Sequence, residues 1–428
     1  MTSNSDIRYN QPVRAHLLTD PRSHRVWVVD SLYKPLRISG SVPTNKLGAS
    51  RNHGQEHLFH RRDRYGVAGE QLLTIGYIGS SALNAILKAD SDAKVTVYGR
   101  RPEVVEGFSK VDSRLVPAIG SLDDHDKLEK LASEHDITVN CADADGKAAN
   151  QAILRGLKKR HESGKTPILI HTSGTGTLSD LDAGTFATKD IYTDLQKSSE
   201  FKTLASLPDD AFHRDVDLDI VRADQEGYVK AYIILPSTIY GISETPFADA
   251  GLCNPQSQQV PLLIRISLDR KAPAMVGEGK NLWPDVHIQD QADLFALVYQ
   301  GALRGDIGHG ADGYYFGENG EHSMLDVAES IGKALEKRGL GQAEPKTLSK
   351  EELDKYTGGS TYLGTNSRAR AQHSREIGWK PKYGEADFLA SIGPDMDWTL
   401  KSNRGKKDGH FVFGPGPQVV DGHWALPQ

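Results

Sequence analysis

Short apolar runs alternate with amphipathic segments from about residue 71 onward, and this alternation limits the chain to few folds. The apolar runs have the length of buried strands, and between them apolar residues recur at helical spacing. Strands are expected at 94–98, 114–119, 137–142, 166–171 and 229–235, and helices at 80–89, 125–134, 147–160, 291–303 and 324–337. Parallel strands need long crossover connections, usually helices, and these connections are right-handed. The pattern therefore predicts an α/β protein built on a doubly wound parallel sheet.

A glycine pair stands at the start of the first of these helices. The stretch Gly76-Tyr77-Ile78-Gly79 leads into the small and apolar run 80–87. Glycines allow a backbone turn to approach a pyrophosphate closely, and the N–H groups of the first helical turn then point at the anion. The pair is also compatible with a tight turn that binds nothing. We interpret it as part of a dinucleotide-binding βαβ unit in a Rossmann-like domain.

Two arginines follow the next expected strand. Arg100 and Arg101 come directly after strand 94–98. In dinucleotide-binding units an acidic residue at this place favours NAD, whereas arginine accommodates the 2′-phosphate of NADP. The alternative is a solvated turn. The sequence therefore predicts NADP as cofactor, with NAD left open.

Composition narrows the classes of function. The formal net charge of −6 gives no basic excess for binding nucleic acid. Cys141 and Cys253 are far apart and lack C-x-x-C spacing, so neither a disulfide framework nor a metal site is indicated. Apolar runs such as 231–235 are much shorter than a membrane span, and the N-terminus has no apolar signal core. We expect a cytoplasmic protein with a small-molecule substrate and no nucleic-acid or membrane partner.

The first 70 residues differ from the rest. They hold 11 lysines and arginines against 6 acidic residues, and only Arg25–Val29 looks like a strand. We expect most of this basic segment to be disordered. His53-Gly54-Gln55-Glu56-His57 spells the H-x-x-E-H pattern of some metalloproteases. A glycine lies inside it and no periodic apolar face surrounds it, so we interpret it as solvated chain.

Several polar residues stand where helices should begin. Asp123 or Asp124 can cap helix 125–134, and Asp290 can cap helix 291–303. Ser323 and Asp326 have the spacing of a capping box at the start of helix 324–337.

Four stretches together resemble the short-chain dehydrogenase/reductase superfamily in its extended and atypical branches, which include epimerase/dehydratase-like and NmrA-like proteins. They are Gly76-Tyr77-Ile78-Gly79, 171–176 (HTSGTG), 235–241 (LPSTIYG) and 286–290 (VHIQD). The match spans about residues 72–385 and is most like fungal NAD(P)-binding proteins. It implies a Rossmann domain followed by a smaller C-terminal α/β substrate region.

This resemblance sets the expected domain boundaries. Residues 1–70 would be the atypical segment, 71–241 the NAD(P)-binding domain, 242–395 the substrate-binding region and 396–428 a disordered tail. A homodimer is an open expectation. The V-H-I-Q-D stretch would dock the substrate region on the core, and His287 within it is expected to be structural.

The resemblance also implies site residues by position. Ser121 and Leu122 would lie near the adenine, and Ala142 and Asp143 would line the cofactor. Pro236 and Thr238 are expected to border the nicotinamide.

Ser173 falls where the family places the serine that hydrogen-bonds the reacting oxygen. A neutral hydroxyl donor there would polarise that oxygen during hydride transfer. The alternative for Ser173 and the glycines after it is a flexible strand exit.

One departure concerns the general acid/base, which the family forms from a tyrosine with a lysine four residues later. No tyrosine in this sequence has lysine at that spacing. Tyr192 lies 19 residues beyond Ser173 and is the catalytic candidate, but position 196 is Gln and Lys197 is one residue too far. One residue turns a helical side chain by about 100°, so Lys197 would point elsewhere unless a turn brings it round. Lys189 is the other candidate.

A second departure lies before the glycine pair. The family pattern has a further glycine three residues before Gly76, preceded by an apolar first strand, whereas position 73 is Leu and only Gln71–Ile75 could form a strand. We hypothesise that residues 1–72 replace the usual start, through a gene-model error or real divergence.

Three functions follow from these observations. The first is an NAD(P)-dependent oxidoreductase or epimerase/dehydratase-like enzyme acting on a small alcohol or carbonyl, in a context that suggests secondary metabolism. The second is an NmrA-like NADP-binding sensor without turnover. The third is a relic that binds no dinucleotide.

Overall fold

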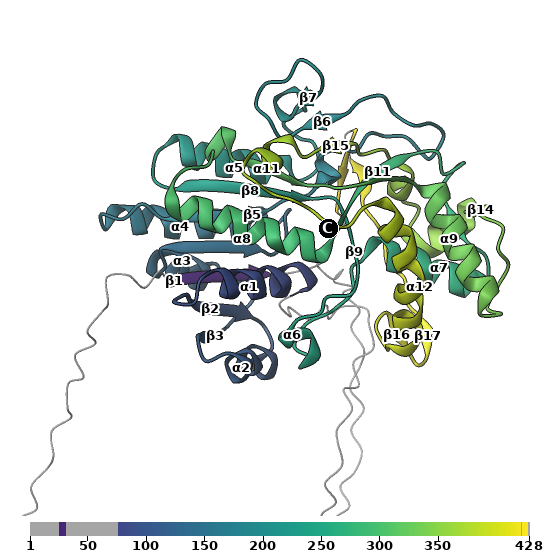
Figure 1. The fold of residues 1–428 in the computed structure, drawn as a ribbon, viewed down its shortest axis with the longest axis horizontal. Coiled ribbons are helices and arrows are strands. Elements are labelled where there is room, and N and C mark those ends of the chain that lie inside the picture. The colour runs from purple at the N-terminus through teal and green to yellow at the C-terminus, as the bar shows by residue number, and fades with distance from the viewer. Residues whose placement is uncertain (1–24, 31–75, 421, 427–428) are drawn as a thin grey trace, which may run out of the picture.

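A seven-stranded parallel sheet forms the centre of the protein (Figure 1). The computed structural model describes residues 25–30, 76–420 and 422–426, the first of these ranges by its backbone alone. The sheet order is β12-β8-β5-β4-β1-β2-β3, and every neighbouring pair is parallel. The strands are β1 (Arg25–Asp30), β2 (Lys94–Gly99), β3 (Leu115–Ile119), β4 (Ile137–Cys141), β5 (Ile168–Thr172), β8 (Lys230–Pro236) and β12 (Tyr314–Gly317). The predicted α/β class with a parallel sheet is confirmed.

Helices connect these strands. They are α1 (Tyr77–Ala89), α2 (Pro102–Val111), α3 (His125–Glu134), α4 (Lys147–Glu162), α5 (Arg214–Gln225) and α8 (Ile288–Arg304). Helix α1 packs against α8, and α4 lies between α3 and α5 (Figure 1). The chain builds outward from β1 to β2 and β3, then crosses back to β4 and continues to β5, β8 and β12. The order therefore reverses between β1 and β4, the place where ligands bind in open α/β sheets.

Strand β1 comes from the segment that the sequence assigned to the atypical N-terminus. The strand-like character of Arg25–Val29 is confirmed, because Val28 pairs with Val97 of β2 on one side and with Val139 of β4 on the other. The domain boundary expected at residue 71 leaves out this central strand. The alternative first strand, Gln71–Ile75, lies outside the described residues, as does the H-x-x-E-H stretch. The central first strand that the resemblance requires is thus present, and residues 31–76 separate it from α1 in the sequence.

A second hydrophobic cluster lies beside the carboxyl end of the sheet (Figure 1). Its helices α7 (Gln259–Arg270), α9 (Met324–Lys337) and α12 (Glu385–Lys401) pack on one another. Its strands are β9 (Thr238–Tyr240), β10 (Ala274–Met275), β11 (Leu282–His287), β13 (Glu321–Ser323) and β14 (Lys346–Thr347). Short helices α6 (Pro246–Asp249) and α10 (Lys350–Thr357) complete this part.

The expected helix caps are confirmed in part. Ser323 and Asp326 form the predicted capping box at the start of α9. Asp124 stands at the N-cap of α3, but its carboxylate accepts from the backbone of Ser121 instead. Asp290 is not the N-cap of α8. His287 takes that place, and its Nδ1 accepts from the backbone N–H of Gln289.

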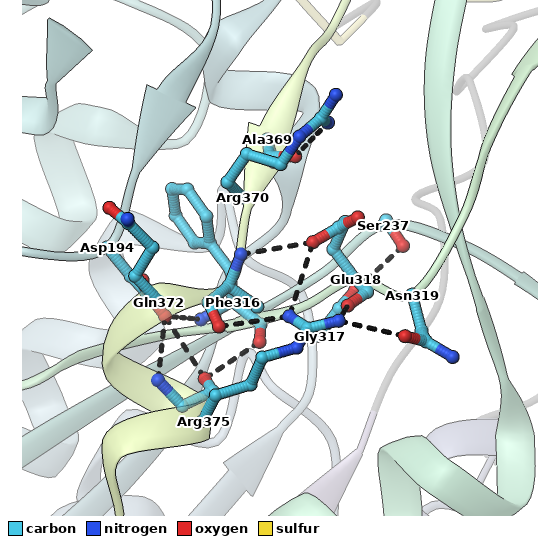
Figure 2. Close-up of polar contacts among 12 residues, drawn as sticks. Asp194, Ser237, Phe316, Gly317, Glu318, Asn319, Ala369, Arg370, Gln372 and Arg375 are labelled. Carbon is cyan, nitrogen blue, oxygen red and sulfur yellow. Dashed lines mark hydrogen bonds and ion pairs between the residues drawn. The ribbon is translucent and has the colours of Figure 1, made fainter. Parts of the chain in front are cut away.

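A buried carboxylate ties the C-terminal segment to the sheet (Figure 2). Strand β6 (Tyr192–Thr193) pairs with β7 (Lys202–Thr203) and β15 (Ala369–Arg370), and α11 (Gln372–Glu376) follows. Asp194 accepts from the backbone N–H of Phe316 at 2.9 Å, of His373 at 2.8 Å and of Ser374 at 3.1 Å. Its carboxylate therefore caps α11 and joins that helix to β12.

Replacement of this carboxylate should weaken the fold. Asp194→Ala leaves three backbone N–H groups without their acceptor, two of them buried, and each unmade bond of this kind costs about 1–3 kcal/mol. We expect the free energy of unfolding to fall by about 3 kcal/mol, measured by urea denaturation. Asp306→Ala, at an exposed ion pair, is the control and should change it by less than about 1 kcal/mol. Equal effects of the two variants would contradict this account of Asp194.

The structure differs from the sequence expectation at the C-terminus. Helix α12 continues to Lys401, and four short strands follow: β16 (Lys406–Lys407), β17 (His410–Phe411), β18 (Gln418–Val420) and β19 (His423–Ala425). Trp424 anchors this tail, since it is buried against Tyr362 and donates from its indole to the carbonyl of Asp180 at 2.7 Å. Contacts of this kind, with residues far away in the sequence, leave no periodicity in the tail itself, which is why its composition suggested little order.

Candidate functional site

The carboxyl ends of β4, β5 and β8 carry a group of buried polar side chains. Ser173 follows β5 directly and is held there by its backbone N–H, which donates to the carbonyl of Ile234 in β8 at 2.9 Å. Because the strands are parallel, their carboxyl ends share one edge of the sheet. Ser173 therefore lies at the edge where the chain order reverses.

The hydroxyl of Ser173 donates to the carboxylate of Asp217 at 2.9 Å. Asp217 lies in the first turn of α5 and is 1% exposed. Burial raises the pKa of Asp217 to about 7, although the Ser173 hydrogen bond opposes that shift. The Ser173 hydroxyl has one proton, so it can donate to a substrate oxygen only when it is not donating to the Asp217 carboxylate. Protonated Asp217 satisfies this condition by donating to Ser173 itself.

A neutral histidine approaches the same carboxylate from β5. His171 is fully buried, and its Nε2 lies 3.8 Å from the second oxygen of Asp217. Its Nδ1 faces the amide of Asn140, which in turn donates to Asn150 of α4 at 2.8 Å. Burial lowers the pKa of His171 to about 3, so the ring is uncharged at neutral pH. Neither His171 Nε2 nor the facing Asp217 oxygen has a hydrogen-bond partner among the described residues.

A second histidine stands at the start of α5. Its Nδ1 lies 2.8 Å from the carboxylate of Asp145, in the loop after β4. The backbone of His213 is left-handed, with φ 66° and ψ −19°. Sequence reasoning did not single out His213, Asp145 or Asp217.

The sequence-predicted catalytic Tyr192 lies elsewhere, on β6. It lines a cavity of about 170 Å³ with Phe212 and Trp424, among others. Burial raises the pKa of its phenol, and Lys202, at 6.0 Å from the ring centre, opposes that shift. Within the described part of the chain no hydrogen bond joins Tyr192 to Ser173.

The predicted phosphate-binding stretch opens α1 at the same edge. Gly76 is the N-cap, no acidic residue occurs in the first turn, and Ile78 packs partly buried on the core. Gly79 is buried in that turn. Tyr77 is buried and its hydroxyl donates to the carbonyls of Tyr240 at 2.9 Å and Gly241 at 2.5 Å. Tyr77 thus fixes the start of α1 against the end of β9.

The remaining predicted cofactor residues also follow strand ends. Arg100 and Arg101 come after β2, and Arg101 is the N-cap of α2. Ser121 and Leu122 come after β3, and the carbonyl of Ser121 accepts from Tyr98 at 2.6 Å.

Beyond β4, the Ala142 N–H donates to Asn140 at 3.0 Å, and the Asp143 carboxylate accepts from the Asp145 N–H at 3.1 Å. Pro236 ends β8, and Thr238 of β9 donates to Gln259 at 2.8 Å. The structure therefore brings the predicted cofactor residues to the edge that holds Ser173.

Known proteins were compared with this sequence and fold. No family model matches the sequence. Oxidase ucsJ of Acremonium sp is 28% identical over 329 residues, which are 72% of this chain and 90% of the relative. A Schizosaccharomyces pombe protein is 25% identical over 326 residues, 72% of this chain and 92% of its own length.

Two solved structures are similar in fold. The dTDP-glucose 4,6-dehydratase of Bacillus anthracis, in complex with NAD, has a TM-score of 0.52 at 17% identity and covers 77% of this chain and 96% of its own. UDP-glucose 4-epimerase of Thermotoga maritima has a TM-score of 0.51 at 14% identity, with 76% and 97% covered. This chain has the Rossmann-like fold of these two enzymes. The expected Rossmann architecture is confirmed.

The start of α5 carries a histidine–aspartate pair. His213 and Asp217 stand four residues apart, the spacing that the sequence resemblance led us to expect for a tyrosine and a lysine. Our sequence reasoning searched for tyrosine by residue type, so the pair went unnoticed. A His-x-x-x-Asp pattern at the expected start of a crossover helix is the signal that could have found it.

Two further findings concern this fold as a whole. No three His, Cys, Asp or Glu side chains within residues 76–420 and 422–426 group as metal ligands. None of the helices described is long and apolar enough to cross a membrane.

Proposed function

We propose that this protein is an NAD(P)-dependent oxidoreductase that acts on a small alcohol or carbonyl substrate. The observation that carries the proposal is the buried Ser173–Asp217 hydrogen bond at the carboxyl edge of the sheet. A buried hydroxyl held by a carboxyl group of raised pKa is expensive to maintain for stability alone. The similarity to a protein named as an oxidase favours redox chemistry over isomerisation.

The residues present fit a dinucleotide. The start of α1 offers backbone N–H groups without an acidic side chain in its first turn, which suits a diphosphate. Arg100 and Arg101 follow β2, where a 2′-phosphate of NADP would be recognised. Ala142 follows β4, and its single methyl group would allow a cofactor to approach the end of this strand closely. When bound, the nicotinamide supplies or accepts a hydride.

The chain's own groups would act on the substrate oxygen. With Asp217 protonated, the Ser173 hydroxyl is available to donate to that oxygen and to stabilise the negative charge that develops there. His171 stays neutral, with its Nε2 3.8 Å from the other oxygen of Asp217. Residues 242–395 are proposed to bind the rest of the substrate. Cytoplasmic location, a homodimeric state and a role in secondary metabolism stay predictions.

Titration of the protein with NADPH and NADH, followed by cofactor fluorescence and by the melting temperature, tests the proposal. We expect saturable binding, with NADPH tighter. If neither nucleotide binds or shifts the melting temperature of folded protein, the proposal fails. The sensor alternative, favoured by the absent tyrosine–lysine pair, predicts binding without turnover.

Arg100 provides a specific prediction about the cofactor. Arg100→Ala removes a charged donor to a 2′-phosphate, worth about 1.5–3 kcal/mol, so the Kd for NADPH should rise about tenfold or more. NADH has no such phosphate, and its Kd should change less than about twofold. Fluorescence titration measures both. The matched control is Arg155→Ala, at an exposed ion pair on α4, which should alter neither Kd. Equal losses for the two cofactors would contradict this role of Arg100.

A further inference from the structure

His213 is held in a backbone conformation that side chains other than glycine rarely adopt. Three such residues occur in the described ranges: His213, Lys271 and Asp408. Lys271 ends a helix and Asp408 turns a hairpin, where left-handed residues are common. His213 instead begins a helix, where extended backbone is usual. Such strain costs about 1–3 kcal/mol and persists only where the surroundings enforce it, often at active sites.

The imidazole is fixed in orientation by two contacts. Its Nδ1 lies 2.8 Å from Asp145, and its ring stacks on Phe212 with centroids 3.8 Å apart. Since the Asp145 carboxylate only accepts, Nδ1 keeps its hydrogen in both charge states of the ring. The proton that His213 can gain or lose is therefore on Nε2.

That Nε2 faces the loop directly after Ser173. A Cβ added to Gly174 would lie 3.6 Å from His213 Nε2, and one added to Gly176 would lie 3.1 Å from it. One turn further along α5, Asp217 holds the hydroxyl of Ser173. Nε2 has no hydrogen-bond partner within the described part of the chain, and the His213 side chain is 15% exposed. A substrate oxygen beside Ser173 would therefore lie close to His213 Nε2, the nitrogen whose proton can be gained or lost.

The surrounding charges favour the protonated ring. Burial lowers the pKa of His213, but the carboxyl groups of Asp145, Asp217 and Asp143 together outweigh burial and hold the pKa above its ordinary value. His171 also faces this group but is neutral. A histidine whose pKa is raised above its ordinary value can give a proton as an imidazolium and take one as a neutral ring.

We propose that His213 is the proton donor and acceptor of this site, with Asp145 as its positioning residue, in place of the tyrosine–lysine pair that the chain lacks. In reduction, a hydride from the nicotinamide cofactor bonds to the carbonyl carbon and the carbonyl π pair moves onto oxygen. That oxygen takes the proton from Nε2, which leaves a neutral imidazole. Alcohol oxidation reverses each movement. This inference rests on the proposed function and names its acid/base.

The first test uses the protein without cofactor. Proton NMR titration of the histidine rings, with His213 assigned by the signal lost in His213→Asn, should give His213 a pKa above 6.5. Asp145→Asn should lower that pKa, because the neutral amide no longer stabilises the imidazolium. A His213 pKa below 6.5, or one unmoved in Asp145→Asn, overturns the inference.

The second test measures turnover in His213→Asn. Asparagine tolerates left-handed backbone, so this variant keeps the turn that alanine would strain. With para-nitrobenzaldehyde and NADPH, we expect kcat to fall about a hundredfold, the usual scale of acid–base catalysis. The Kd for NADPH should change less than about twofold, and added imidazole should restore part of the rate.

His309→Asn is the matched control. His309 also pairs with an aspartate, Asp224 at 2.7 Å, but before β12 begins, at the opposite edge of the sheet. It should keep wild-type turnover. In the wild type, the reduction rate should fall as pH rises through the His213 pKa, and in Asp145→Asn that fall should occur at lower pH.

The outcomes separate the inference from the proposed function. Wild-type turnover in His213→Asn overturns the assignment of the proton to His213 while oxidoreductase function stands. Failure of the wild type to bind NADPH overturns the proposed function. The NMR titration is done without cofactor, so it tests the His213–Asp145 pair independently of that outcome.

Discussion

Ser173→Ala should lower kcat for the NADPH-dependent reduction of para-nitrobenzaldehyde by about 10²–10³-fold, the loss measured when one preorganised donor to a developing oxyanion is removed. The side chain is 8% exposed and changes by one oxygen atom, so little repacking is needed. Binding of NADPH should be preserved, because Ser173 lies at β5 whereas the diphosphate is expected at α1. The measurement is a steady-state rate by loss of cofactor fluorescence, together with the Kd.

The control for this prediction is another serine with a single hydrogen bond. Ser391→Ala on α12 removes a hydroxyl that donates to Phe388 at 2.7 Å, within the second hydrophobic cluster. It should leave kcat within about twofold of wild type. If Ser173→Ala retains wild-type kcat while binding NADPH normally, the hydroxyl does not contact the reacting oxygen, and the sensor alternative gains support.

Local sequence signals were sufficient for most of the sheet. Helices α3 and α9 have the bounds expected from apolar spacing, because each has one apolar face and a polar residue at its start. Strands β4 and β5 are short, rich in apolar residues and almost entirely buried, as strands covered on both faces must be. The pattern of each of these elements is visible in its own stretch of sequence, so the element could be predicted without knowledge of its tertiary contacts.

The first strand and the tail were harder to predict for a physical reason. β1 is set by pairing with β2 and β4, strands far along the chain, and one short run such as Arg25–Asp30 cannot show which strands it will join. Trp424 of the C-terminal hairpin likewise packs on Tyr362 and donates to the carbonyl of Asp180, both far from it in the sequence. Asp290 was expected as a cap on its own helix, but its carboxylate accepts from Lys382 and Tyr383 instead.

The sequence predicted the positions of the site residues in the fold, but it did not predict which of their side chains form hydrogen bonds with one another. Ser173 and the cofactor residues were found because strand ends meet at one edge whatever the details of packing. The contacts of Asp145 with His213 and of Asp217 with Ser173 join residues 68 and 44 positions apart. No local period encodes such pairs, and a search by residue type fails when a histidine stands where a tyrosine is expected.

Asp217→Asn should make the protein more stable than wild type at alkaline pH. The pKa of Asp217 is raised by burial from 3.8 to about 7 in the folded state. Between these pH values the unfolded chain releases the proton and the folded protein keeps it. The stability that protonated Asp217 contributes is therefore fully present below pH 3.8 and is lost as the pH rises through about 7. Across this pH range the free energy of unfolding of the wild type falls by roughly 4 kcal/mol on account of Asp217. Asparagine does not titrate, and its side-chain oxygen can still accept from Ser173.

The test is the urea-induced unfolding of wild type and variant between about pH 4 and pH 8.5. The stability gained by Asp217→Asn should be near zero at the acid end and grow to a few kcal/mol above neutrality. Asp215→Asn is the matched control on the same helix, since Asp215 is half exposed and pairs with Lys147 at 3.1 Å. Its effect should stay below about 1 kcal/mol at every pH. A pH-independent difference for Asp217→Asn would mean that Asp217 is ionised throughout, and the Ser173 hydroxyl would then be committed to Asp217 rather than available to a substrate.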